Sequence, residues 1–139
     1  MGSTSAGALL QLRIELNGIY LGRPTDLLLD VVSWHVLGFV VHCGDESARF
    51  LPYAAAQPSA ERIAVGSALM LLEDVGFYEQ RGVSFRSLLD GRVGPNGVLR
   101  DLRIGPGGAV TELEVERDGT IERVPAAGLA VSPTRLSAA

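Results

Sequence analysis

Residues 111–116, Thr-Glu-Leu-Glu-Val-Glu, carry the clearest secondary-structure signal in the chain. The three glutamates fall on one face of an extended strand, and Thr111, Leu113 and Val115 fall on the other, because successive side chains of a strand point in opposite directions. Asp118-Gly119 follows as a tight turn into further strand-forming residues. The stretch therefore predicts a half-buried β-hairpin.

A second hairpin signal lies directly upstream. Asn96-Gly97 is a favourable two-residue turn, and it introduces a strand in which Val98, Leu102 and Ile104 are expected on one face. Gly-, Pro- and Asp-Gly-containing turns recur along the rest of the chain and divide it into runs of about 5–8 residues. This spacing predicts an all-β barrel or sandwich rather than a helical domain.

The first half of the chain is more apolar than the second. Residues 27–29 are Leu-Leu-Leu and residues 39–41 are Phe-Val-Val, with no polar alternation. Short continuous apolar runs are typical of strands that are covered on both faces. We expect the outer face to be covered by the other half of the chain or by another molecule.

Residues 67–81 interrupt the β pattern with good helix formers. Ser67 could cap the start of a helix and Gly82 could end one, although Gly76 interrupts the segment. We interpret residues 75–82 as a connector, partly helical, between two units.

The two halves can be aligned as diverged copies of one unit. Aligning Leu28-Leu29-Asp30 with Leu99-Arg100-Asp101 brings into step a Gly-containing turn, a strand, a polar turn and a strand that ends at Pro52 or Pro125. The ordered series predicts a duplication, with units at residues 9–74 and 83–133. Residues 1–8 and 134–139 are small and polar, and we expect them to be loose.

This series resembles the PRC-barrel family. The motif elements match as follows: Leu21-Gly22-Arg23-Pro24, Leu28-Leu29-Asp30, Gly38-Phe39-Val40-Val41, Leu51-Pro52 and Ile63-Ala64-Val65 in the first copy, and Leu89-Asp90-Gly91-Arg92-Val93, Leu99-Arg100-Asp101, Val124-Pro125 and Leu129-Ala130-Val131 in the second. The resemblance covers residues 19–132 and implies one small β-barrel per unit. It also implies an adaptor role, since related domains in a photosynthetic reaction-centre subunit and a ribosome-maturation factor dock on other macromolecules. The family brings no catalytic residue, and we predict no cofactor.

The charge pattern argues against nucleic acid as a partner. The net charge is -4, the pI is near 5.1, and all twelve basic residues are Arg spread singly along the chain, so no basic patch attracts phosphates. Residues 8–74 hold eight acids and four Arg, whereas residues 75–139 hold eight of each. The first unit therefore carries the whole negative excess.

No apolar stretch approaches the ~20 residues that span a bilayer, and residues 1–12 lack the pattern of a signal peptide. We therefore expect no membrane insertion and a cytoplasmic location. Cys43 is the only cysteine, which excludes an intrachain disulfide.

The candidate chemistry is sparse. His35, His42 and Cys43 are the only nitrogen and sulfur metal ligands, and a strand would send His42 and Cys43 to opposite faces. Residues 94–97 and 105–108 are glycine-rich, but prolines remove backbone donors there and strands follow, so we interpret them as turns rather than phosphate loops. We predict no catalytic residue and no metal site.

Aromatic side chains are the best candidates for a docking surface, because Trp and Tyr concentrate binding energy at interfaces. The candidates are Trp34, Phe39, Tyr53, Phe77 and Tyr78. The competing interpretation is that Trp34, Phe77 and Tyr78 pack at the junction between the units.

The sequence thus predicts a non-enzymatic adaptor that binds a protein partner. That partner could be a second copy of the chain, which would form a homodimer through the apolar first unit. The alternative is a regulatory domain that binds a small molecule or metal at a barrel mouth or between the units.

Overall fold

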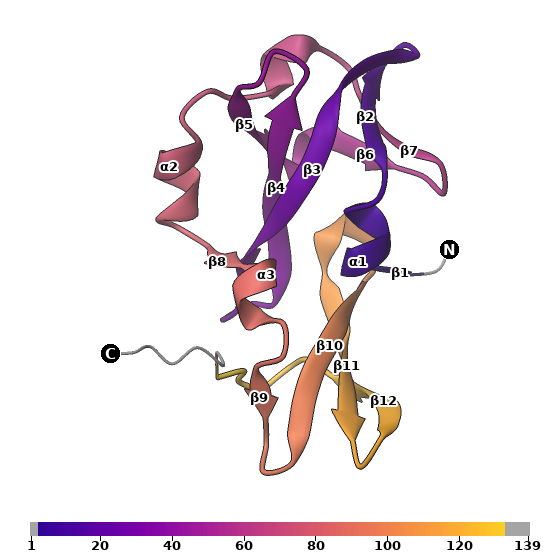
Figure 1. Ribbon diagram of the computed structural model, residues 1–139, viewed down its shortest axis with the longest axis vertical. Helices are drawn as coiled ribbons and strands as arrows, with labels where there is room; N and C mark the ends of the chain where they lie inside the picture. Colours follow the sequence, from indigo (N-terminus) through magenta and orange to yellow (C-terminus); the bar gives the residue numbers. More distant parts are fainter. Residues whose placement is uncertain (1–2, 133–139) are drawn as a thin grey trace.

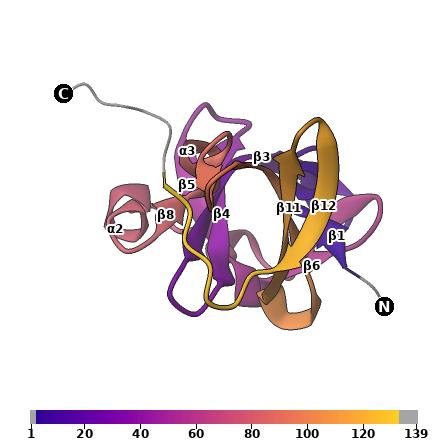
Figure 2. The same ribbon diagram turned by 90° about the horizontal axis from the view of Figure 1, so that it is seen from below.

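Two curled β-sheets stand one above the other and together form a half-barrel (Figures 1 and 2). The structure is a computed structural model and describes residues 3–132. Its elements are mainly strands joined by short helices, which confirms the all-β prediction.

The first sheet is built mostly from the first half of the chain. Its strands run in the order β5-β4-β3-β2-β7-β6, with β8 beside β3, and β2 with β7 is its parallel pair. The bounds are β2 Arg13–Leu16, β3 Ile19–Asp30, β4 His35–Cys43, β5 Ala48–Pro52, β6 Ala56–Pro58, β7 Arg62–Val65 and β8 Val83–Ser84.

The second sheet has the order β1-β10-β11-β12, with β9 paired to β10. Its strands are β1 Thr4–Ser5, β9 Arg92–Val93, β10 Gly97–Ile104, β11 Val110–Arg117 and β12 Thr120–Pro125. The helices are short: α1 Ala6–Leu9, α2 Val75–Glu79, α3 Phe85–Leu88, and the 3₁₀ turns η1 Tyr53–Ala55, η2 Ala68–Met70 and η3 Pro106–Gly108.

Each half of the chain lends its first strand and helix to the sheet of the other half. The β1–α1 segment pairs with β10 of the second sheet, and the β8–α3 segment pairs with β3 of the first sheet. Ser5 and Ser84 cap these two helices in the same way, each accepting a hydrogen bond from the backbone N–H three residues later. The exchange ties the two sheets together through backbone pairing.

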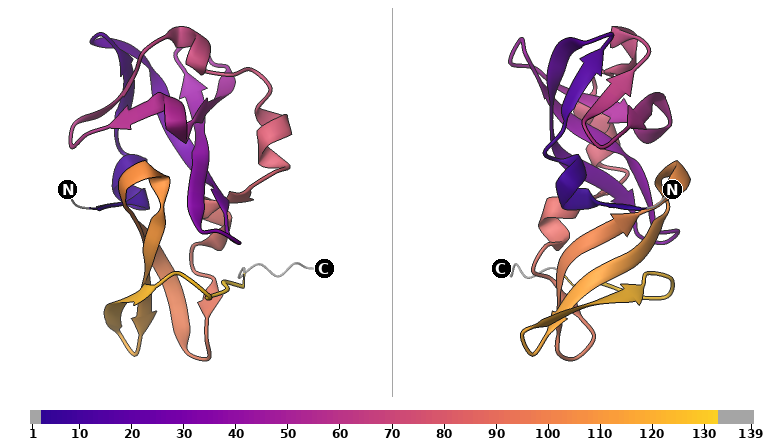
Figure 3. Two further views of the ribbon diagram at one scale, coloured as in Figure 1. Left: turned by 180° about the vertical axis from the view of Figure 1, so that it is seen from behind. Right: turned by 90° about the vertical axis from the view of Figure 1, so that its right-hand side faces the viewer.

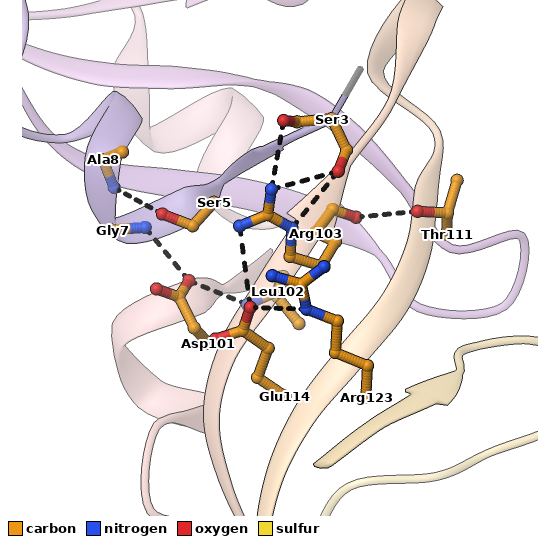
Figure 4. A network of polar contacts seen from close by, with 10 residues as sticks. All are labelled: Ser3, Ser5, Gly7, Ala8, Asp101, Leu102, Arg103, Thr111, Glu114 and Arg123. Atoms are coloured by element: carbon orange, nitrogen blue, oxygen red, sulfur yellow. Dashed lines mark hydrogen bonds and ion pairs between the residues drawn. The ribbon is translucent and has the colours of Figure 1, made fainter. Parts of the chain in front are cut away.

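An aspartate in the middle of the receiving strand fastens each exchanged segment. Asp26 of β3 accepts hydrogen bonds from Leu27 N at 2.8 Å, from Arg86 N at 3.1 Å and from the Ser84 hydroxyl. Asp101 of β10 accepts from Leu102 N at 2.8 Å and Gly7 N at 3.0 Å (Figure 4). In both arrangements the aspartate accepts from the next residue of its own strand and from the second residue of the exchanged helix, Arg86 or Gly7.

These contacts correct the register of the duplication. Aligning Asp30 with Asp101 is wrong, because Asp26 is the residue that matches Asp101. Both strands also carry a register shift directly before the aspartate and a second one two to three residues after it. Asp30 instead ends β3 and accepts hydrogen bonds from Val32 N and Ser33 N in the turn.

The register shifts also change which residues face the core. In residues 111–116 the partly buried glutamates alternate with buried Leu113, as expected. Thr111 is exposed, because the β10–β11 pairing shifts register there, between the Arg103–Glu112 and Ile104–Val110 pairs. Leu99, rather than Val98, is the buried residue at the start of β10 for the same reason. Leu102 and Ile104 are buried as predicted.

Two segments differ from the predicted boundaries. Residues 1–8 are not loose from Thr4 onward, since β1 and α1 are formed there and Ala6 is fully buried. Val83 and Ser84 pair with the first sheet although the repeat assigned them to the second unit. Residues 75–79 form α2, as the helical interpretation of the connector expects, and residues 134–139 lie outside the described part of the chain.

Candidate functional site

One groove lies between the two sheets, and we call it the inter-sheet groove. Its second-sheet side carries Thr4, Leu9, Ile104 and Pro106, and its first-sheet side carries the residues of η1 and β6 together with Ser59 and Ala60. In Figure 3 the η3 turn lies close to β6, in agreement with this lining. The groove has a volume of about 750 Å³, which is within the range of small-molecule sites.

Tyr53 is held in a fixed orientation in this groove. Its ring stacks on the fully buried ring of Phe39, with 5.8 Å between the ring centroids. On the second-sheet side the ring lies against Gly108, where an added Cβ would come within 2.8 Å of it. Gly108 also has a φ of 86°, so glycine suits both the backbone conformation and the close approach.

A second groove lies at the far end of the first sheet, and we call it the Tyr20–Leu69 groove. Tyr20 and Leu21 of β3, Cys43 at the end of β4, and Leu69 and Leu71 beside η2 line its apolar part. Its volume is about 470 Å³. The Leu69 side chain is 83% exposed, which is unusual for a leucine next to an apolar groove.

Most charged side chains in the two segments beside the Tyr20–Leu69 groove are acidic. Residues 43–49 and 67–74, which contribute to its lining, hold four carboxylates and one guanidinium, and of these Asp45 and Arg49 line the groove itself. That guanidinium, Arg49, is shared between Asp45 at 3.9 Å and Glu73 at 3.5 Å. Hydrogen bonds from Ser47 hold the pKa of Asp45 below its usual value, so this rim carboxylate stays ionised at neutral pH.

The five aromatic residues chosen from the sequence do not form one surface. Trp34 and Phe39 are buried, at 5% and 0% exposure, and the Trp34 indole donates to the Leu129 carbonyl across the sheets. Tyr78 stacks on the buried ring of Phe50, and Phe77 is partly exposed beneath the Arg81 guanidinium. Tyr53 lines the inter-sheet groove, and Trp34 lines a smaller pocket of about 300 Å³ together with Leu129.

Leu69 is not among the sequence-based candidates, because its apolar run also fits the helical interpretation of residues 67–81. Residues 69–72 read Leu-Met-Leu-Leu, and a run of this kind in a connector is a signal that could have marked a surface. Leu71 is buried, whereas Leu69 and Met70 are exposed.

The three soft ligand candidates do not come together. The His35 ring nitrogen is hydrogen-bonded with Ser33, whereas the His42 Nε2 lies 3.4 Å from Glu46. Within residues 3–132, no group of three or more His, Cys, Asp or Glu side chains is placed to hold a metal ion.

Iodoacetamide is expected to modify Cys43 at least about tenfold more slowly in the folded protein than in the urea-unfolded chain. Burial shields the thiol and raises its pKa, so little reactive thiolate is present near neutral pH. Timed mass spectrometry at constant pH measures the two rates. Equal rates would show that the floor of the Tyr20–Leu69 groove is open to solvent.

A scan against protein-family models finds no match to this chain, and a search of curated proteins finds no significantly similar one. Among the described residues, no helix has the length and apolar character needed to cross a membrane.

Proposed function

We propose that the protein is a non-enzymatic interaction module whose Tyr20–Leu69 groove binds a short segment of a partner protein. The exposure of Leu69 on the rim of an apolar groove is the observation that carries this proposal. Exposed apolar side chains grouped around a groove are typical of protein-binding surfaces. The resemblance of the duplicated unit to PRC-barrel adaptors supports the same function.

The charge of the two segments beside the groove indicates the chemistry of the partner. A segment with one apolar anchor, flanked by Arg or Lys, would fill the groove, and its flanks would meet Asp45 in the lining and the carboxylates of the adjoining segments 43–49 and 67–74. A second copy of this chain fits less well, because it would bring its own acidic segments against those of the first. The same proposal places the module in the cytoplasm, a reducing compartment where its free thiol is stable.

Peptide selection tests this function directly. A phage-displayed random peptide library selected on the full chain is expected to yield peptides with an apolar anchor and adjacent basic residues. Leu69→Asp should weaken the selected peptides at least about tenfold by removing apolar contact and adding negative charge in the groove. Higher salt should weaken binding further, since the basic flanks act through charge.

Ile121→Asp is the matched control, because Ile121 is also an exposed apolar residue, at 53%, but lies on β12 of the second sheet. It should leave peptide affinity unchanged. Peptides without basic flanks, or peptides that bind Leu69→Asp equally well, would contradict the proposal. A dimer on light scattering that Leu69→Asp dissociates would assign the groove to a second copy instead.

A further inference from the structure

The inter-sheet groove differs in character from the Tyr20–Leu69 groove. Its lining mixes apolar side chains with exposed polar atoms, and its hydroxyl groups belong to Ser3, Thr4, Ser59 and Tyr53. No charged side chain of residues 3–132 lines it. The Arg103 guanidinium lies at its edge, where it donates to Ser3 and pairs with Glu114 at 3.6 Å, so its charge is already compensated. A charged guest would therefore lose hydration without gaining a free ion-pair partner, which disfavours it.

The groove offers one pre-oriented aromatic face. Phe39 and Gly108 hold the Tyr53 ring from two directions, so little conformational freedom is left for a guest to remove. Partial burial raises the pKa of the Tyr53 phenol, which keeps it neutral at physiological pH. Its hydroxyl makes no hydrogen bond to any of residues 3–132, so it can bond to a guest.

We infer that the inter-sheet groove is a binding site for a small, uncharged molecule with a flat apolar body and a polar edge. The apolar body would pack against Tyr53, Leu9 and Ile104, and the polar edge would meet the Tyr53 and Thr4 hydroxyls, because the Ser59 hydroxyl already bonds to residues 61 and 62. This site is separate from the Tyr20–Leu69 groove, so the inference does not depend on the proposed function.

Such a ligand would touch both sheets at once. Thr4, Ile104 and Pro106 belong to the second-sheet side, whereas Tyr53 and Ala56 belong to the first-sheet side. Because the ligand contacts both, it stabilises their packing against each other, and binding raises the thermal unfolding midpoint.

The test uses two probes that differ in charge. N-phenyl-1-naphthylamine is neutral, flat and apolar with one N–H at its edge, and 8-anilinonaphthalene-1-sulfonate adds an anionic group to nearly the same rings. Fluorescence titration of the full chain is expected to show binding of the neutral probe, with the sulfonated probe at least about tenfold weaker at this site.

Two tryptophan variants locate the bound probe. Ala60 and Ala68 are both exposed, and each lines one groove, Ala60 the inter-sheet groove and Ala68 the Tyr20–Leu69 groove. Ala60→Trp fills the inter-sheet groove and should reduce affinity for the neutral probe at least about tenfold, whereas Ala68→Trp should leave it unchanged. Circular dichroism confirms that both variants are folded.

Three results would overturn the inference. The first is no saturable binding of the neutral probe, and the second is equal affinity of both probes at the site. The third is loss of binding in Ala68→Trp but not in Ala60→Trp, which would move small-molecule binding to the other groove. Peptide binding by the Tyr20–Leu69 groove is measured separately and is unaffected by any of these outcomes.

Discussion

Replacing Phe39 with Ala is expected to lower the free energy of unfolding by about 4 kcal/mol. Phe39 is fully buried in the centre of the first sheet, where it lies between Leu27 of β3 and Leu51 of β5 in the strand pairing. The truncation removes apolar contacts and leaves a cavity, and it also removes the ring on which Tyr53 stacks. Urea unfolding followed by circular dichroism measures the change.

The loss is large relative to the stability of a typical small domain, so Phe39→Ala is expected to unfold at a much lower urea concentration. Phe77→Ala is the control, because Phe77 is an aromatic on α2 that is 43% exposed. It should change the free energy of unfolding by less than about 1 kcal/mol. Similar effects of the two substitutions would mean that Phe39 is not part of the core.

Local sequence patterns predicted most of the strands and much of the core. The alternation in residues 111–116 and the turns at residues 96–97 and 118–119 predicted β10, β11 and β12 because hairpin formation is local. Continuous apolar runs likewise predicted that β3 and β4 are deeply buried, and Leu27, Leu29 and Phe39 are.

Residues whose environment depends on distant chain segments could not be placed this way. Trp34 follows Asp30 in a turn, where exposure is usual, yet the segment around Leu129 covers it. Leu69 has the same apolar character as its neighbour Leu71, but the two have opposite exposure. Burial in these cases is decided by tertiary packing.

The predicted alignment of the two copies was wrong for a related reason, namely that it depends on long-range contacts. A sequence alignment matches Asp30 with Asp101 because each follows a similar short motif, whereas the structural match is Asp26. Asp30 ends β3 whereas Asp101 lies inside β10, and the contacts that identify Asp26 as its counterpart come from a distant segment. The exchange of β1–α1 and β8–α3 between the sheets is a long-range contact that periodicity does not encode.

Replacing Asp26 with Ala is expected to lower the free energy of unfolding by about 3 kcal/mol. The substitution leaves Leu27 N, Arg86 N and the Ser84 hydroxyl without their acceptor, and Leu27 is fully buried. The lost hydrogen bonds fasten the β8–α3 segment to β3, so the segment should also show faster amide hydrogen exchange. Asp26→Asn keeps one oxygen acceptor, so it should lower the free energy of unfolding by less than Asp26→Ala.

Asp30→Ala is the control that separates the two alignments. Asp30 accepts hydrogen bonds from Val32 N and Ser33 N within an exposed turn, and these hold its pKa below the usual value, but among the described residues its carboxylate makes no hydrogen bond or ion pair with the exchanged segment. Its replacement should destabilise the protein clearly less than Asp26→Ala and leave exchange in β8–α3 unchanged. The reverse order would restore Asp30 as the counterpart of Asp101. A double-mutant cycle with Ser84→Ala should give a coupling with Asp26 and none with Asp30, because coupling requires direct contact.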